Sequence, residues 1–133
     1  RIINNVNLNI SATCTRVPIV DGHTAIINIS FANKKPSIQD FKEIIKSYIS
    51  LPQILKLPSA PVQPIHILDE MDRPQPKLDL NNDKGMALSI GRIQKDLFFD
   101  IRFIGLSHNT LRGAAGGAIL NAELLVKKKY ISS

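Results

Sequence analysis

The sequence is poor in several features that would define its class at once. Its 133 residues contain one cysteine, no tryptophan, two tyrosines and five phenylalanines. A single thiol excludes an internal disulfide and a cysteine-based metal cluster, and it predicts a reducing, cytoplasmic compartment. No apolar run approaches the roughly 20 residues of a membrane-spanning helix, and no signal-peptide pattern opens the chain. We therefore expect neither a metal site nor a membrane partner.

Size, composition and charge indicate one folded domain without a nucleic-acid partner. Hydrophobic residues make up 44% of the chain and charged residues 21%, as in a globular protein. The length suffices for one ordinary core but not for two. The formal net charge is +6, which raises the question of an anionic partner. However, the lysines and arginines are scattered, with one run at 127–129, and no nucleic-acid-binding motif appears.

Alternation of apolar and polar residues predicts the strands, because successive side chains of a strand point to opposite faces. The predicted strands are 6–13, 25–31, 65–68, 86–93 and 98–106. The last two are separated by a plausible turn at Lys95-Asp96 and are expected to pair. His66 lies alone within the third of these strands, and we expect it to be exposed or hydrogen-bonded rather than catalytic.

Two long helices are predicted. Ser37 with Asp40 three residues later is a capping-box variant, and an apolar stripe follows it at Ile38, Phe41, Ile44, Ile45, Tyr48 and Ile49. Four prolines between 51 and 64 mark a loop. The second helix is expected to start at a cap, Asn109 or Thr110, and to reach about Lys128. One face of it carries Leu111, Ala115, Ile119, Ala122 and Val126.

These elements predict an α+β fold, in which helices cover one face of a mixed, largely antiparallel sheet. The other face would be available to a partner subunit. Gly113, Gly116 and Gly117 fall in the first turns of the final helix, where each costs about 1 kcal/mol relative to alanine. Something must therefore approach the backbone closely, either another helix or a ligand at the helix N-terminus. No strand precedes these glycines and no G-x-G-x-x-G occurs, so they are not a dinucleotide-binding fingerprint.

The most informative side chains lie between Ser11 and His23. Arg16 and His23 stand seven residues apart, with Pro18 and Asp21-Gly22 between them, so a turn is expected to bring them to one place. Arginine binds a carboxylate with two parallel hydrogen bonds, and an imidazole changes charge near neutral pH. On the residues alone, a surface or structural role for this pair stays open beside a role in a site.

Four strings in this order resemble the C-terminal domain of aspartate-semialdehyde dehydrogenase, in the branch found in archaea and fungi. They are Ser11-Ala12-Thr13-Cys14-Thr15-Arg16-Val17-Pro18 with Asp21-Gly22-His23, then Asp72 to Asp79, then Gly91-Arg92-Ile93, and finally Leu106 to Thr110 running into Arg112 to Gly117. Their order and approximate spacing also agree, so the resemblance covers nearly the whole chain.

The resemblance implies an NADP-dependent enzyme that interconverts aspartyl phosphate and aspartate semialdehyde through a cysteine thioester, a step toward lysine, methionine and threonine. It implies that His23 is the acid/base, that Arg16 holds the carboxylate of the substrate, and that Asn109 contacts the nicotinamide nucleotide. It also implies a homo-oligomer, either a dimer or a tetramer, with phosphate among its small-molecule ligands.

The departures from the family pattern are equally informative. The nucleophilic cysteine and the glycine-rich loop of the N-terminal Rossmann domain lie in an earlier segment, which this chain lacks. Cys14 stands in a predicted strand and is expected to be a buried, inert thiol. We therefore expect residues 1–133 to form a substrate-binding and dimerisation domain that is inactive alone, with NADP bound mainly by the absent domain. The C-terminal helix, about 110–128, would pack back on that domain.

Three other functions stay open. Malonyl-CoA reductase has the same architecture and keeps the glycine-histidine pair, but it lacks the sequence motif that runs from Cys14 to Pro18 here. A non-catalytic dimerisation module is the second alternative, and a basic nucleic-acid binder is a distant third. We assign no chemical role to the stretch from Arg73 to Asp79, and Arg92 and Arg112 are left outside the site.

Overall fold

A four-stranded sheet forms the centre of the computed structural model, which describes residues 9–131. The strands are β1 (His23–Ile29), β2 (Ile65–Leu68), β3 (Leu88–Lys95) and β4 (Ile101–Ser107). Their order is β1-β4-β3-β2. Both β1 and β3 run antiparallel to β4, whereas β2 runs parallel to β3. The predicted mixed, largely antiparallel sheet is confirmed, with strand bounds shifted by up to three residues.

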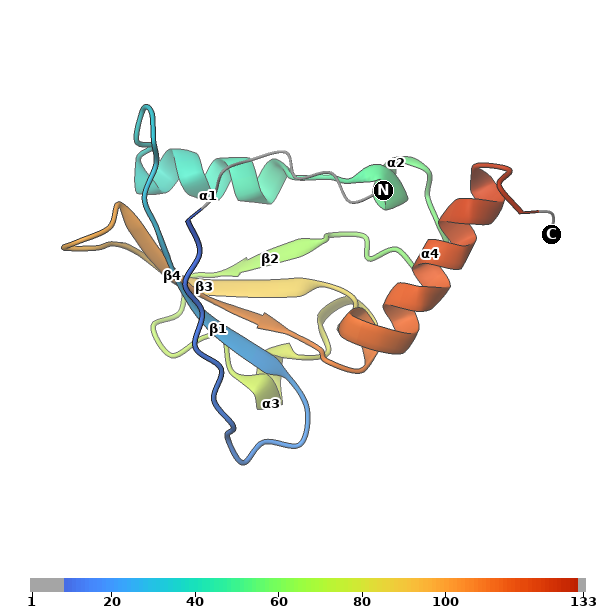
Figure 1. Ribbon diagram of the computed structural model, residues 1–133, viewed down its shortest axis with the longest axis horizontal. Coiled ribbons are helices and arrows are strands. Elements are labelled where there is room, and N and C mark those ends of the chain that lie inside the picture. The colour runs from blue at the N-terminus through green and yellow to red at the C-terminus, as the bar shows by residue number, and fades with distance from the viewer. Residues whose placement is uncertain (1–8, 132–133) are drawn as a thin grey trace.

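The helices lie on the faces and at one end of this sheet. They are α1 (Ile38–Ser47), α2 (Leu51–Ile54), α3 (Pro76–Asp79) and α4 (Gly116–Lys127). In Figure 1, α1 lies along one face of the sheet, the short α3 lies on the other side and α4 stands beside one end. The capping box is confirmed, because Asp40 N donates to Ser37 Oγ at 3.0 Å and Ser37 N donates to Asp40 Oδ2 at 3.3 Å. The four-residue α2 lies in the segment that was expected to be only a loop.

The main core lies between α1 and the sheet, as the apolar stripe of that helix predicts. Its buried members are Ile90, Ile93, Ile101 and Phe103, and α1 contributes Ile38, Phe41 and Ile45. The rings of Phe41 and Phe103 lie 5.7 Å apart. A second cluster of Leu57, Met86 and Leu120 joins α4 to the rest of the chain.

The predicted strand at 6–13 is wrong where the structure describes it. Residues 9–13 are exposed and form no strand, and residues 6–8 lie outside the described part. A segment with alternating side chains forms a strand only when its backbone pairs with a neighbouring strand. Within 9–131, β1 pairs with β4 alone, so residues 9–13 do not extend the sheet beyond β1. Cys14 is exposed, so the expected burial of its thiol is also wrong, because no described element covers that segment.

The final helix begins differently from the prediction. A π-helical turn, Leu111–Ala115, precedes α4. Neither Asn109 nor Thr110 caps it, because both side chains bind the segment before β1. The cap is instead His108, whose Nδ1 accepts the backbone N–H of Thr110 and of Leu111, each at 3.3 Å.

Tight packing explains two of the three glycines at this helix start. A Cβ on Gly116 would lie 2.5 Å from Met86 Sδ and 2.8 Å from the Leu111 carbonyl oxygen, and one on Gly117 would lie 2.7 Å from the Arg112 oxygen. Gly113 has no such neighbour nearer than 3.5 Å. The buried side of α4 carries Leu120, which packs near Leu124. Most of the apolar face expected on this helix, Ala115, Ile119, Ala122 and Val126 among its members, is exposed.

Gly116→Ala is expected to destabilise the protein by about 1–2 kcal/mol, since the new methyl group overpacks against backbone that must shift. Gly113→Ala is the matched control and should change stability by no more than a few tenths of a kcal/mol or increase it, because alanine is the better helix former. Urea unfolding of both variants measures the difference. Equal midpoints would contradict the packing explanation.

Candidate functional site

The antiparallel pairing of β1 with β4 places His23 beside the start of the final helix. His23 is the first residue of β1, and its Cα lies opposite that of Ser107 at the end of β4. The chain continues from Ser107 directly into His108, Asn109 and Thr110. Two of the three predicted site residues, His23 and Asn109, therefore come to the same end of the sheet although 86 positions separate them.

Gly22 fixes the turn that leads to His23. Its φ of 112° belongs to the left-handed side of the Ramachandran plot, where a residue with a Cβ is strained. Its N–H donates to Asn109 Oδ1 at 2.8 Å, and a Cβ would approach Leu80 Cδ1 to 3.1 Å. The Asp-Gly pair of the sequence thus marks a buried turn that only glycine fits well.

Asn109 has a defined orientation because its carbonyl oxygen accepts the Gly22 N–H. This assigns Oδ1 to the turn and directs the amino group, Nδ2, away from it. A carboxamide amino group donates two hydrogen bonds, and Nδ2 donates none to any residue within 9–131. Asn109 therefore holds the turn with one end of its amide and presents donors with the other.

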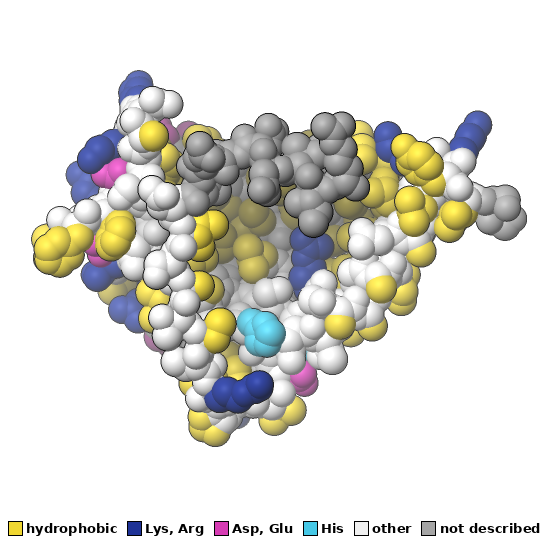
Figure 2. Space-filling view, in the orientation of Figure 1, with side chains coloured by type: hydrophobic (Ala, Val, Ile, Leu, Met, Phe, Trp, Pro, Cys, Tyr) yellow, Lys and Arg dark blue, Asp and Glu magenta, His cyan; other side chains and the backbone are white. Residues whose placement is uncertain are grey.

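Arg16 lies in the exposed segment of residues 9–20. Across the part of the chain that the structure describes, neither its side chain nor that of His23 forms a hydrogen bond or an ion pair. Figure 2 shows this face of the molecule hollowed between α4 and the segment that leads to β1, with a histidine ring and basic side chains in the hollow and at its lower edge. The predicted meeting of Arg16 and His23 across a turn stays a prediction.

The stretch from Arg73 to Asp79 holds in place the residue that packs against the Gly22 turn. Asp79 is 2% exposed, and it accepts from Arg73 Nε at 2.7 Å, from Arg73 Nη2 and from Gln75 N at 2.6 Å. The hydrogen bond from Arg73, and then that from Gln75, hold the pKa of Asp79 below its ordinary value against the opposing effect of burial. The next residue, Leu80, packs against Gly22, as does Leu106.

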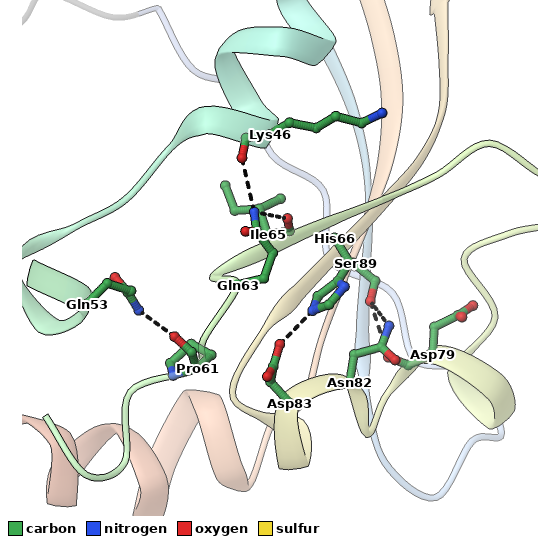
Figure 3. Close-up of polar contacts among 10 residues, drawn as sticks. All are labelled: Lys46, Gln53, Pro61, Gln63, Ile65, His66, Asp79, Asn82, Asp83 and Ser89. Atoms are coloured by element: carbon green, nitrogen blue, oxygen red, sulfur yellow. Dashed lines mark hydrogen bonds and ion pairs between the residues drawn. The ribbon is translucent and has the colours of Figure 1, made fainter. Parts of the chain in front are cut away.

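His66 is hydrogen-bonded, as the sequence led us to expect. Its Nε2 lies 2.6 Å from Asp83 Oδ2, a carboxylate of the 3₁₀ turn Asn82–Gly85. Figure 3 shows this pair beside a second set of contacts. There Asn82 Nδ2 donates to Ser89 Oγ at 3.0 Å, and Ser89 Oγ donates to the Asp79 carbonyl at 3.2 Å. These polar contacts attach the 3₁₀ turn to β2 and β3.

Sequence reasoning missed three polar residues around the turn. Thr110 Oγ1 donates to Asp21 Oδ1 at 3.1 Å, and His108 is 8% exposed and binds the backbone of residues 110 and 111. The string from Ser107 to Thr110 attracted attention in the sequence, but only Asn109 received a role. Nothing local predicts that Asp21 and Thr110 meet, because 89 positions separate them.

Elsewhere, the described part of the chain has a groove on the sheet, but no metal-binding cluster and no membrane-spanning helix. Within residues 9–131, His, Cys, Asp and Glu side chains form no group of three or more suited to a metal ion. No helix of that part is long and apolar enough to cross a membrane. Arg92, one of the two arginines left outside the site, lines a shallow groove on the sheet with Ile26 and Arg102.

A family model described as the semialdehyde dehydrogenase dimerisation domain matches residues 1–112. The chain belongs to this family. The matched part contains Arg16, His23 and Asn109 and ends within the π-helical turn that precedes α4. The resemblance seen in the four strings is therefore confirmed at the level of the family.

Relatives of this semialdehyde dehydrogenase domain include aspartate-semialdehyde dehydrogenases from fungi and archaea. The Schizosaccharomyces pombe enzyme is 50% identical over 121 residues, which cover 90% of this chain and 34% of that protein. The Saccharomyces cerevisiae enzyme is 42% identical over 132 residues, covering 98% of this chain and 36% of that protein. The Methanothermobacter thermautotrophicus enzyme is 43% identical over 126 residues, covering 93% and 36%. The chain thus spans about a third of the length of these curated relatives.

Solved structures of the same family agree with the fold. Aspartate semialdehyde dehydrogenase from Candida albicans, crystallised with NADP, matches with a TM-score of 0.80 at 46% identity, covering 86% of this chain and 32% of that chain. Aspartate semialdehyde dehydrogenase II from Vibrio cholerae, complexed with ASA, matches with a TM-score of 0.66 at 20% identity, covering 86% and 30%. The second likeness shows the fold alone, and the α+β prediction is confirmed.

Asp79→Asn is expected to lower the free energy of unfolding by about 2–3 kcal/mol, because it breaks a buried ion pair whose arginine is partly exposed. Asp79 has a lowered pKa in the folded state, so its contribution is complete above the ordinary value of 3.8 and is lost as the pH falls below it. The difference between wild type and variant should therefore be constant near neutral pH and shrink below pH 3.8.

Asp69→Asn is the matched control for that experiment. Asp69 also pairs with a cation, Lys42 at 2.6 Å, but its side chain is 64% exposed, and such surface pairs contribute little. Its unfolding curve should match that of the wild type. An Asp79→Asn effect no larger than that of the control would contradict the supporting role of the buried pair.

Proposed function

We propose that this chain is the C-terminal portion of an NADP-dependent aspartate-semialdehyde dehydrogenase. That enzyme reductively dephosphorylates aspartyl phosphate to aspartate semialdehyde through a cysteine thioester. Relatives with this name are 42–50% identical over 90–98% of the chain. The observation that carries the proposal is the bond from Gly22 N to Asn109 Oδ1, because it joins the residue before the proposed acid/base to the proposed cofactor contact.

His23 would act as the acid/base. Its exposed side chain stands at the start of β1, and an imidazole gives or takes a proton near neutral pH. In the reductive direction it would protonate the carbonyl oxygen of the thioester as hydride adds to the carbon, and it would take that proton back as the C–S bond breaks and the thiolate leaves. Arg16 would hold the carboxylate of the substrate, since a planar guanidinium fixes both charge and orientation.

Asn109 would contact the nicotinamide nucleotide with Nδ2, the end of its amide that the Gly22 turn leaves available. Such a donor suits a carbonyl oxygen, and it lies on the segment that follows the strand paired with β1. The cofactor, when bound, supplies or accepts hydride. This chain would contribute orientation, whereas most of the cofactor contacts would come from a nucleotide-binding domain.

The chain alone would be inactive, because the family resemblance puts the nucleophilic cysteine outside residues 1–133. Cys14 is exposed but stands two positions before Arg16, where the resemblance does not put a nucleophile. On α4, the exposed Ile119, Leu125 and Val126 would pack against the nucleotide-binding domain. A cytoplasmic location, inferred from the single thiol, belongs to the same proposal.

The full-length protein that contains this chain should reduce NADP with aspartate semialdehyde and phosphate. His23→Gln should lower kcat by about 100-fold with little change in KM, because proton transfer is lost while binding remains. Arg16→Lys should instead raise KM for the semialdehyde about tenfold, through the loss of one charge-assisted hydrogen bond. Steady-state kinetics separates the two effects.

His66→Gln serves as the control, since His66 is a histidine of the same fold that pairs with Asp83 outside the proposed site. Its kcat should stay near the wild-type value. A near-normal kcat for His23→Gln would remove His23 from the acid/base role. If the full-length protein reduces malonyl-CoA but does not turn over aspartate semialdehyde, the result would favour malonyl-CoA reductase instead.

Assembly into a homo-oligomer is the second function, favoured by the family description and by the sheet face opposite α1. Ile26 on this face is 76% exposed, although its neighbour Ile27 packs into the core. Ile26 lines the shallow groove together with Phe103, Ile104, Arg92, Gln94 and Arg102. An exposed β-branched side chain over a groove of mixed character suits a self-complementary contact between two copies.

Ile26→Asp should therefore weaken the dimer or tetramer of the full-length protein by at least tenfold in Kd, because it introduces an unpaired charge into the contact. Sedimentation equilibrium measures the constant. Val62→Asp is the control, since Val62 is 88% exposed in the segment between α2 and β2. Unchanged assembly of the Ile26 variant would exclude this face.

A further inference from the structure

The geometry points to Thr110 as a positioning residue for His23, with His108 holding Thr110 in place. This inference rests on the proposed function in one respect, namely that His23 is the acid/base. The hydrogen bonds that carry it are features of the fold and stand apart from that role. The sequence offered Thr110 only as a candidate helix cap, and it gave His108 no role.

His108 is built into the structure as an acceptor. Its ring is 8% exposed, and two backbone N–H groups, those of Thr110 and Leu111, are directed at Nδ1. Nδ1 is therefore the ring position that accepts hydrogen bonds from the backbone. The ring also fills space against the backbone at Gly85, where a Cβ would lie 2.9 Å from its Cδ2. The backbone at residues 110 and 111 is thereby anchored to a ring that has little room to move.

The Thr110 hydroxyl has two acceptors within reach, Asp21 Oδ1 at 3.1 Å and His108 Nδ1 at 3.2 Å. It has one hydrogen to donate. Nδ1 already receives two N–H groups, whereas the carboxylate is charged and forms the stronger hydrogen bond. The hydroxyl therefore donates to Asp21.

Two consecutive residues of the helix start thus bind two consecutive residues of the turn. Thr110 holds Asp21, and Asn109 holds Gly22. These bonds fix the chain over the two positions immediately before His23, and the pairing with Ser107 fixes His23 itself. A single bond would let the turn pivot, whereas two adjacent bonds define its direction. Because an acid/base that is misplaced by about 1 Å loses about 100-fold in rate, this double attachment would set the turnover.

Thr110→Val and Thr110→Ser form a matched pair for the test, carried out on the full-length protein. Valine has the shape of threonine without the hydroxyl, and serine keeps the hydroxyl. Thr110 is exposed, so both variants are expected to fold. Thr110→Val should lower kcat about tenfold or more with KM for NADP changed less than about twofold, and Thr110→Ser should restore most of kcat. If Thr110 had only a structural role, Thr110→Val would lower the stability of the protein without lowering kcat selectively, and Thr110→Ser would not restore kcat.

Hydrogen exchange measured by mass spectrometry on the peptide that spans residues 17–23 gives a readout independent of activity. Exchange should be faster in Thr110→Val than in the wild type and should return toward the wild-type rate in Thr110→Ser. His108→Asn, which keeps an acceptor near the position of Nδ1, should exchange more slowly than His108→Leu.

Unchanged exchange in Thr110→Val would overturn the attachment of the turn. Faster exchange with an unchanged kcat would overturn the positioning role. If the wild-type protein shows no dehydrogenase turnover, the proposed function fails, and the exchange rates still decide whether Thr110 holds the turn.

Discussion

The hydrogen bond from Gly22 N–H to Asn109 Oδ1 joins the two parts of the chain on which the proposed site depends. It connects residues 87 positions apart at 2.8 Å, and it satisfies the N–H of a buried residue whose φ of 112° suits glycine. A buried backbone donor without a partner costs about 1–3 kcal/mol. Asn109 therefore stabilises the turn by accepting the Gly22 N–H, and the turn fixes the orientation of the Asn109 amide. The bond also sets which end of the Asn109 amide remains available to a ligand.

Around this bond the fold is arranged in supporting layers. The β1–β4 ladder brings His23 opposite Ser107, and the buried Arg73–Asp79 pair holds the segment whose Leu80 lies under Gly22. His108 anchors the helix start from within the structure. The long helix α1 packs on the sheet far from these residues in sequence and supplies the core that keeps the ladder in place. The proposed site thus depends on one hydrogen-bonded corner of the α+β domain, where the turn before β1 meets the start of the final helix.

Local signals in the sequence were sufficient for much of this fold. The capping box at Ser37 and the amphipathic stripe behind it predicted α1, and alternation predicted all four strands to within a few residues. Local signals failed where a distant partner decides the outcome. Residues 9–13 alternate like a strand but meet no neighbour in the described part, and with them Cys14 stays exposed. The cap of the final helix is His108 because Asn109 and Thr110 are occupied elsewhere, which no local pattern reveals.

The candidate site shows the same division. The strings around His23 and Asn109 identified the family, and the fold brings these two residues to the same end of the sheet. The pattern of the strings did not reveal Thr110 or the structural role of Asp79, because both depend on contacts that fold topology creates.

A crystal structure of the full-length protein with NADP would test the central claim most directly. We expect Gly22 N within hydrogen-bond distance of Asn109 Oδ1, with Asn109 Nδ2 directed at the nicotinamide nucleotide and His23 facing the reacting carbon. A Gly22 N–H bound elsewhere, or an Asn109 amide remote from the cofactor, would contradict the account.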